Sequence, residues 1–348
     1  MRSFLLPLLL LHIAPLAEAG IHSVDDPCPF NAEANGQAKP LPQQQFLILL
    51  AERLSGLVPE KPGESGTQDW FSTVNEDDLP TWRANYTAKL QQWRATRHYR
   101  EKNLRGYDLA SHAAVLFRLG ATTQAIELLQ PELRSRVPNY WSVANLVHVH
   151  AERGEWDIAY NRLQHLEDID DVAALPGHSP EQLNWLKAVN AGPYHSWIQQ
   201  RLKETKHRVA LEQLKPDELD YGLLLPSSIA VVQQLCLWSP TDARLLWLLA
   251  ELHLQAGHIR EANELFQLLA DGRKFNGPKQ FQENRRKAMD EFARLPRDQP
   301  IVAPGPENLG LFDVAKQPMF WPIVSGFVLI VAGLVILQVR SLSKKNRA

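Results

Sequence analysis

The sequence predicts an all-α protein made of paired helices, followed by a single C-terminal transmembrane helix. Three observations support this fold class. A glycine, a small residue and a large apolar residue recur at fixed offsets in the middle of the chain, twenty uncharged residues lie near its end, and an apolar run opens it. With 45% hydrophobic and 22% charged residues, the composition excludes a disordered chain and a polytopic membrane protein.

Residues 1–19 have the layout of a secretory signal peptide. Arg2 precedes a short apolar run, and Ala17 and Ala19 form an A-x-A cleavage site directly before Gly20. We therefore expect the mature chain to begin near Gly20. An uncleaved signal anchor is the alternative, which the shortness of the apolar run and the small residues at its end disfavour.

Residues 20–76 are predicted to form an irregular arm, because residues 21–45 are rich in Pro, Gln, Asn and Ala and show no periodicity. One short helix is expected within this arm, from Gln43 to Leu57. The proline- and glycine-rich segment that follows it, Pro59–Thr67, predicts a loop.

A helical repeat domain is predicted from residue 77 to residue 295. Its first helix is expected over Asp77–Arg105, where large side chains recur every three or four residues: Trp82, Tyr86, Leu90 and Trp93. The opposite face of this helix is basic, a feature that nucleic-acid binding can explain. Because the segment is expected to be exported and the exported part is mildly acidic overall, a solvated face is favoured and no nucleic acid is expected as a partner.

The most informative pattern is a repeat of about 34 residues. Three glycines are each followed five residues later by an alanine and nine residues later by a large apolar residue; the pairs are Gly120 and Ala125, Gly154 and Ala159, and Gly257 and Ala262. Each glycine is expected to end the first helix of a hairpin, and each alanine to lie where the second helix crosses the first. The hairpins are expected over residues 107–119 and 123–133, 141–153 and 155–166, and 242–256 and 259–270.

At these residues the sequence resembles the tetratricopeptide repeat family. The resemblance covers Gly106–Asn139, Tyr140–Ala173 and Ala243–Asn276, and it implies a solenoid of stacked helical hairpins. The proline that usually follows the second helix appears only as Pro138, and the first helix lacks the usual tryptophan. An array of generic helical hairpins is the alternative.

Residues 174–240 are expected to hold two degenerate units. Helices are predicted over Ser179–Val189, His195–Lys206 and Ser227–Leu237, with breaks at Gly192-Pro193 and Pro226, and Gly222 lies two periods after Gly154. A polar capping helix over Pro278–Leu295 is expected to close the array, with one side formed by Phe281, Ala288, Met289 and Phe292.

The last fifty residues predict a membrane anchor. Residues 296–319 are rich in proline and are expected to form a stiff stalk. Residues 320–339 carry no charge and reach about 30 Å as a helix, enough to cross a bilayer. The basic residues in 340–348 place this tail in the cytoplasm and the helical domain outside it, in a periplasmic, lumenal or extracellular compartment. The sequence does not identify the organism or the membrane.

Signals of chemistry are weak. The chain has no P-loop, no G-x-S-x-G and no H-E-x-x-H motif, so we expect neither an enzyme nor a bound cofactor. His148 and His150 point to different faces of one helix, so no metal site is expected. Cys28 and Cys236 can form a disulfide in an oxidising compartment or remain thiols. Asn85 begins a glycosylation acceptor sequence, which we attribute to chance because it lies within a predicted helix.

The resemblance to tetratricopeptide repeats implies a concave groove that binds a segment of a partner. Carried over by position, the groove would be lined by Tyr107, Arg118, Trp141, Asn145, His148, Glu152, Arg244, Trp247, Glu251 and Gln255. The two tryptophans would supply contact area and the flanking charges would set the register of the bound segment. The alternative is that Trp141 and Trp247 pack between neighbouring helices.

These features predict a membrane-anchored scaffold or assembly factor that binds proteins or peptides outside the cytoplasm. One alternative is a membrane-tethered enzyme with its site in residues 174–240, around His178, His195 or His207. Another is a structural ectodomain that associates with further copies of itself.

Overall fold

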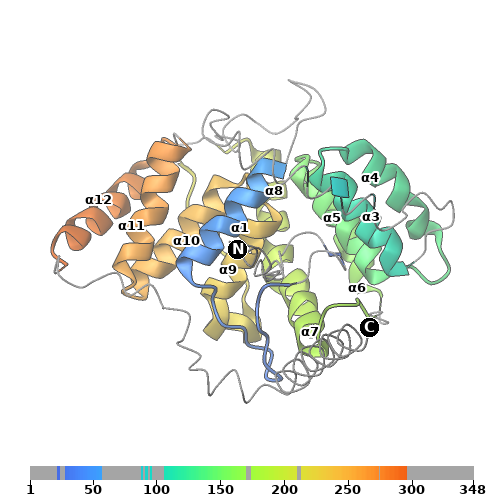
Figure 1. Ribbon diagram of the computed structural model, residues 1–348. Coiled ribbons are helices and arrows are strands. Elements are labelled where there is room, and N and C mark those ends of the chain that lie inside the picture. Colours follow the sequence, from blue (N-terminus) through green and yellow to red (C-terminus); the bar gives the residue numbers. More distant parts are fainter. Residues whose placement is uncertain are drawn as a thin grey trace, which may run out of the picture. The chain divides into compact units, whose positions relative to one another are not determined.

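The computed structural model describes residues 22–23, 28–56, 106–169, 174–209, 213–273 and 275–295, together with four isolated helical positions between 88 and 95 (Figure 1). The predicted signal peptide, the loop Pro59–Thr67, most of the helix Asp77–Arg105, the stalk, the transmembrane segment and the tail lie outside the described residues, as does Asn85. Among the described helices, none combines the length and the apolarity that crossing a bilayer requires.

The described part of the chain is all-α, as predicted. No strand is assigned within the described residues, where an isolated antiparallel bridge joins Ala32 and Ala38. The α-helices are α1 (Gln43–Gly56), α3 (Gly106–Arg118), α4 (Thr122–Leu129), α5 (Tyr140–Glu152), α6 (Trp156–Glu167), α7 (Pro180–Val189), α8 (His195–His207), α9 (Ser228–Trp238), α10 (Ala243–Gln255), α11 (Ile259–Gln267) and α12 (Lys279–Ala293). Four short 3₁₀ or π turns adjoin α-helices: η2 (Gln130–Arg134), η3 (Asn190–Tyr194), η5 (Gly222–Ser227) and η6 (Leu268–Gly272).

The three helical hairpins that the glycine pattern predicts are α3 with α4, α5 with α6, and α10 with α11. Gly120, Gly154 and Gly257 have φ angles of +79°, +71° and +78°, a region that L residues rarely adopt. In the first hairpin the Ala121 N–H donates to the Leu116 carbonyl and the Gly120 N–H to the Phe117 carbonyl, the two bonds of a Schellman motif. The same pair of bonds recurs after α5 and α10. Each glycine therefore ends a helix because its backbone must turn left-handed.

The small residue of each hairpin lies in the protein interior. Ala125, Ala159 and Ala262 have no exposed surface, and the large apolar residues four positions later, Leu129, Leu163 and Phe266, are buried beside them. Within a close-packed interior, a side chain larger than alanine at these crossings would push the two helices apart.

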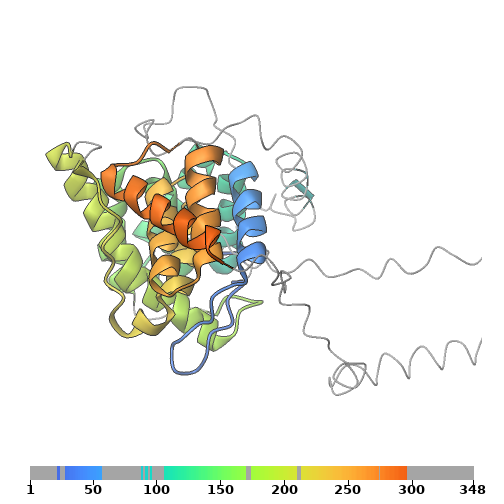
Figure 2. The same cartoon turned by 90° about the vertical axis from the view of Figure 1, so that its left-hand side faces the viewer.

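The hairpins are packed in a row, which we call the helical body (α3 to α12). Neighbouring contacts connect α3 and α4 to α5, α6 to α8, α9 to α10, and α11 to α12. Figure 1 shows this order from α3 and α4 at one end to α12 at the other. The arm helix α1 packs against α9, and Figure 2 shows α1 and α8 on opposite sides of the view with α10 and α11 between them.

The predicted break at Gly192-Pro193 is wrong. α7, the π turn η3 and α8 form one uninterrupted helical run, because Asn190 and His195 both keep right-handed helical angles. Proline lacks an N–H and its ring clashes with the preceding turn of an α-helix, and a π turn accommodates it by inserting an extra residue. The run instead ends at Arg208, whose φ of +50° is left-handed.

Two further details differ from the predicted pattern. Gly222, two periods after Gly154, begins the 3₁₀ turn η5 rather than ending the first helix of a hairpin. On α12, Phe281 and Ala288 are buried against the body, but Met289 and Phe292 are each 43% exposed. A single narrow stripe of α12 is enough to cover α10 and α11, so its remaining apolar residues stay outside.

Candidate functional site

The N-terminal arm (residues 22–23 and 28–56) packs against the helical body and buries apolar side chains there. Phe30 is fully buried, with its ring centroid 5.1 Å from that of Trp185 on α7. Further along the arm, Phe46 and Leu50 of α1 are buried in the same core as α9. Segments more than a hundred residues apart in the chain therefore share one interior.

Side chains of the body bind the backbone of the arm directly. The Asn145 amide donates to the His22 carbonyl at 2.8 Å, and the Gln182 amide donates to the carbonyls of Cys28 and Phe30 at 3.2 and 3.0 Å. The Gln233 side chain accepts from the Leu41 N–H at 2.8 Å and donates to the Leu41 carbonyl at 3.1 Å.

A histidine completes this set. His178 Nε2 accepts a hydrogen bond from the Cys28 N–H at 3.1 Å. We call Asn145, His178, Gln182 and Gln233 the backbone clamp. An amide side chain carries both a donor and an acceptor, which is what an irregular backbone needs once it leaves water. The clamp therefore binds backbone groups and not a particular side chain.

The first described residue of the arm, His22, lies in a cage of rings formed by Trp141, His148, Tyr194 and Trp238. Its ring centroid lies 4.6 Å from that of Trp141, 5.4 Å from that of Trp238 and 5.5 Å from that of His148. His148 in turn lies 4.4 Å from Tyr194 and 4.6 Å from Trp238. The cage joins α5, η3 and α9, which are far apart in sequence.

Burial makes this cage unfavourable for charge. It lowers the pKa of His22 to about 3, with a smaller contribution from His178, and it lowers that of His148 well below the usual value. At the edge of the cage, burial raises the pKa of Glu152 to about 7, although the Thr241 hydroxyl donates to this carboxylate at 2.7 Å. At neutral pH both histidines are therefore uncharged.

The structure places most of the predicted groove residues inside the protein. Arg118, Trp141, Asn145, His148, Arg244, Trp247 and Glu251 are buried, Glu152 is half-buried, and only Tyr107 and Gln255 of the ten are exposed. The expectation of an open groove lined by this set is therefore corrected.

The physical reasons differ along the set. The arm covers Trp141, Asn145 and His148. Trp247 packs against Phe281, with centroids 5.7 Å apart, and its indole N–H donates to Glu251 at 2.7 Å. Both tryptophans thus have packing roles, which was the alternative interpretation of the sequence.

Arg244 belongs to a buried ionic cluster. Arg201 on α8 binds both carboxylate oxygens of Asp217, at 2.7 and 2.8 Å, and Asp242 at 2.8 Å. Arg244 on α10 binds Glu204 at 2.6 Å and Asp217 at 3.0 Å. Burial alone would raise the pKa of Asp242, but Arg201 and then Arg244 hold it below its usual value. The cluster fixes the segment around Asp217 between α8 and α10.

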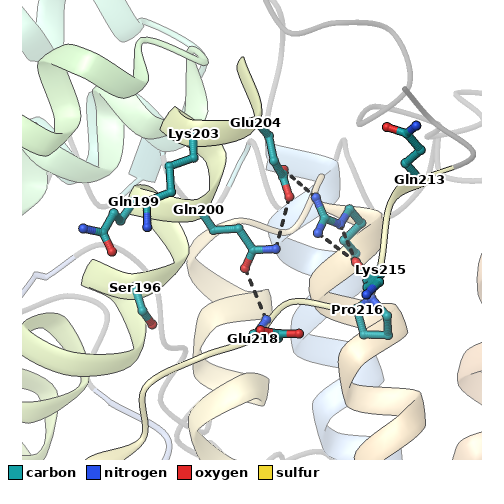
Figure 3. Close-up of a pocket in the computed structure, with 10 residues that line it drawn as sticks. Ser196, Gln199, Gln200, Lys203, Glu204, Gln213, Lys215, Pro216 and Glu218 are labelled. Carbon is teal, nitrogen blue, oxygen red and sulfur yellow. Dashed lines mark hydrogen bonds and ion pairs between the residues drawn. The ribbon is translucent and has the colours of Figure 1, made fainter. Parts of the chain in front are cut away.

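A polar cavity of about 330 Å³ lies beside this cluster (Figure 3). Figure 3 shows Gln199, Lys203 and Glu204 on α8 opposite Lys215 and Pro216; the other lining residues are Ser196, Gln200, Gln213, Glu218 and Arg244. The Arg244 guanidinium is already bound to Glu204, Asp217 and the Lys215 carbonyl. No histidine or cysteine is among the lining residues, and the Ser196 hydroxyl is already engaged, since it donates to the Pro193 carbonyl at 2.9 Å and accepts from the Asp220 N–H at 2.9 Å.

The histidines of the middle segment do not converge. His178 binds the arm, His195 contacts Glu167 at 2.7 Å, and His207 is exposed at the end of α8. Within the described ranges, no three His, Cys, Asp or Glu side chains are arranged to hold a metal ion. Cys28 and Cys236 are buried thiols and are not bridged to each other.

Sequence reasoning included Asn145 in the groove and named His178 in the enzyme alternative, but it missed Gln182, Gln233 and the arm that the clamp binds. His22, His178 and Gln182 lie in segments without a repeat pattern. The one signal was Gln233-Gln234, two amides inside the otherwise apolar helix α9, and both are fully buried. A buried amide requires a polar partner, and here the arm provides it.

The chain matches no protein-family model, and neither curated proteins nor solved structures show significant similarity to it. The arm on its clamp is therefore the observation from which a function is inferred.

Proposed function

We propose that this protein is an exported, membrane-anchored scaffold that binds an extended segment of another protein on the face of its helical body. In this proposal the body is a tetratricopeptide-like solenoid, the signal peptide directs export, and residues 320–339 anchor the chain. The observation that supports binding is the backbone clamp, because it already holds one irregular polypeptide segment, the arm.

The clamp suits a polypeptide better than a small molecule. Its groups are spread from Asn145 on α5 through Gln182 on α7 to Gln233 on α9, and they contact backbone groups from His22 to Leu41. A ligand that satisfies all of them must be an extended chain with regularly available N–H and carbonyl groups. The aromatic residues beside the clamp, Trp141 and Trp185, add apolar contact area at two points of that path.

The arm acts as a tethered competitor in this proposal. Because it belongs to the same chain, its effective concentration at the clamp is high, and a partner must bind more tightly than the arm to replace it. Partners with a comparable sequence of small, apolar and amide residues would therefore bind only where they are locally abundant or where the arm is loosened.

The competing proposal of an enzyme in residues 174–240 has less support. His178 binds the arm, His195 contacts Glu167 and His207 is exposed, and none of the three lines the cavity of Figure 3. A self-associating ectodomain makes a different prediction, since its partner would be a second copy of this chain.

Crosslinking in detergent-solubilised membranes tests the proposal, with full-length protein as bait. Phe30→Ala removes the buried ring that seats the arm and leaves the body unchanged, so it should increase partner recovery several-fold. Adding Gln182→Ala and Gln233→Ala to Phe30→Ala removes clamp donors and should abolish that gain.

Gln267→Ala is the matched control, because Gln267 is an exposed amide on α11. Recovery that is the same for all variants would refute the clamp as the partner site. A crosslinked partner that proves to be this chain itself would favour self-association.

A further inference from the structure

We propose that the arm is an acid-sensitive latch, docked on the helical body near neutral pH through His22 and His178 and released when the pH falls. Release of the arm in this way does not require any particular partner. Its consequence, exposure of the clamp to a partner, rests on the proposed function.

The first element of the latch is the contact between His178 and Cys28. The Cys28 N–H can only donate, so His178 Nε2 must carry a lone pair to accept it at 3.1 Å. The other ring nitrogen, Nδ1, lies 3.5 Å from the Pro176 carbonyl, which suits the tautomer protonated at Nδ1. Protonation of Nε2 would place its N–H opposite the Cys28 N–H, and because neither group can accept, the hydrogen bond would be lost.

The second element is the position of His22 in its ring cage. Asn145 holds its carbonyl and the Asn190 amide lies 3.3 Å from Nε2, so the residue is fixed at both its backbone and its ring. The whole residue is 2% exposed. A protonated imidazole there would lose its hydration and would need an anion in contact with it.

The cage does not supply that anion. Among the described residues, the titratable and charged groups that face it are Arg118 from α3, His148 and Glu152 from α5, His178 before α7 and Tyr194 from η3. The remaining wall, α9, has no charged residue in its sequence. Arg118 is already positive, and protonation of the two other histidines would only add to the positive charge.

Glu152 cannot compensate for the protonation of His22. Burial raises its pKa to about 7, so acidification neutralises this carboxyl group before the imidazoles become charged. Its hydrogen bond to Thr241 connects α5 to the segment before α10, and not to the arm. Protonation of Glu152 on acidification therefore stabilises the body, whereas protonation of His22 weakens docking of the arm.

The sign and size of the effect follow from linkage. The pKa of His22 is about 3 in the docked arm against an ordinary 6.5, so its contribution to docking is present above pH 6.5 and is lost as the pH falls below that value. Between pH 7 and pH 5 this residue alone weakens docking by roughly 25-fold. Burial also lowers the pKa of His178, so its loss of the Cys28 bond acts in the same direction.

Two native cysteines report on the latch. Cys28 lies on the arm and is 6% exposed, whereas Cys236 lies in α9 and is fully buried. Full-length protein in detergent is labelled with dithiodipyridine at pH 7.5 and pH 5.0, and each rate is divided by that of a thiol peptide at the same pH. We expect the normalised Cys28 rate to rise at least tenfold at pH 5.0 while Cys236 stays protected.

Histidine variants separate the latch from general acid sensitivity. His178→Gln keeps an acceptor for the Cys28 N–H and His22→Phe keeps a ring in the cage, so each should reduce the pH dependence and the pair should abolish it. His207→Gln, at an exposed position on α8, should retain it. Because His178 is only half-buried, His178→Gln is expected to fold. If circular dichroism shows that His22→Phe does not fold, the His178→Gln variant alone is used for the test.

Three results would overturn the latch. These are a normalised Cys28 rate that is the same at both pH values, a parallel rise in Cys236 labelling that signals global unfolding, and a pH dependence that persists unchanged in the double histidine variant. Each leaves the partner-binding proposal intact, because crosslinking at neutral pH tests that separately.

Discussion

The side chain of Gln233 and the backbone of Leu41 are joined by a reciprocal pair of hydrogen bonds, with the amide accepting from the N–H at 2.8 Å and donating to the carbonyl at 3.1 Å. This is the pairing that a β-strand would offer, supplied here by one helical side chain. It connects the arm just before α1 to the middle of α9, and both residues are buried.

Replacing Gln233 by leucine should destabilise the protein because it leaves two buried backbone groups of Leu41 unpaired. We expect a loss of about 1–3 kcal/mol in the free energy of unfolding and faster hydrogen exchange in residues 41–50. Gln267→Leu makes the same chemical change at an exposed site and should have little effect. Equal losses for the two variants would contradict a specific role for the Gln233 pair.

Substitution of a left-handed turn glycine is expected to lower stability through backbone strain alone. A Cβ added at Gly257 meets nothing within 4 Å, so Gly257→Ala tests only the cost of its φ of +78°. We expect a destabilisation of about 1–2 kcal/mol, measured by thermal unfolding. Gly257→Asn should cost less, because asparagine tolerates this region. An asparagine variant no more stable than the alanine variant would argue against the strain.

The alanine at the crossing of α5 and α6 predicts an effect of overpacking. Ala159 has no exposed surface, so Ala159→Leu should force the helices apart and cost about 1–3 kcal/mol in unfolding free energy. Ala256→Leu, at an exposed position after α10, adds the same atoms without a neighbour to displace. Denaturant unfolding of the two variants should differ clearly, and equal stability would show that the interior near Ala159 has spare volume.

Removing the central arginine of the ionic cluster should be severe. Arg201→Met leaves the buried carboxylate of Asp217 with Arg244 and that of Asp242 with the backbone N–H groups of Arg244 and Leu245. Breaking such a buried pair costs about 3–5 kcal/mol. Lys203→Met, two residues along the same helix and exposed, is the control.

The same variant should also change the pH dependence of stability. In the native protein the pKa of Asp242 is held below its usual 3.8, so its contribution is present above that value and is lost as the pH falls further. Without Arg201, burial is opposed by Arg244 and its backbone N–H, so the pKa of Asp242 should rise and unfolding experiments should show the variant gaining stability relative to the native protein on acidification. A variant that loses stability over the same pH range would refute this assignment of the Asp242 shift.

The predicted topology has a direct biochemical test. We expect N-terminal sequencing of the mature protein to begin at Gly20, and deletion of residues 320–348 to release the helical domain from membranes in soluble form. An intact N-terminus would favour the signal-anchor alternative. Retention of the truncated protein in carbonate-washed membranes would show that another segment holds it.

The sequence by itself determined the all-α class, the positions of the helices and the places where hairpins turn. Those features depend on local rules: Gly120, Gly154 and Gly257 are needed where the backbone turns left-handed, and apolar side chains recur with the helical period on the faces that pack. Local rules failed at Pro193, where a π turn lets the helix continue, because the energy of a proline depends on the turn around it.

Only the tertiary structure decided what the candidate site is made of. Trp141, Asn145 and His148 were predicted to face a partner, and the chain's own arm covers them instead. Nothing in the repeat pattern indicates that His22, 123 residues before Asn145, would fill that space. The repeat pattern reports contacts within a hairpin and with its neighbours. The docking of the arm depends on backbone hydrogen bonds to Gln182 and Gln233, which leave no periodic trace in the sequence.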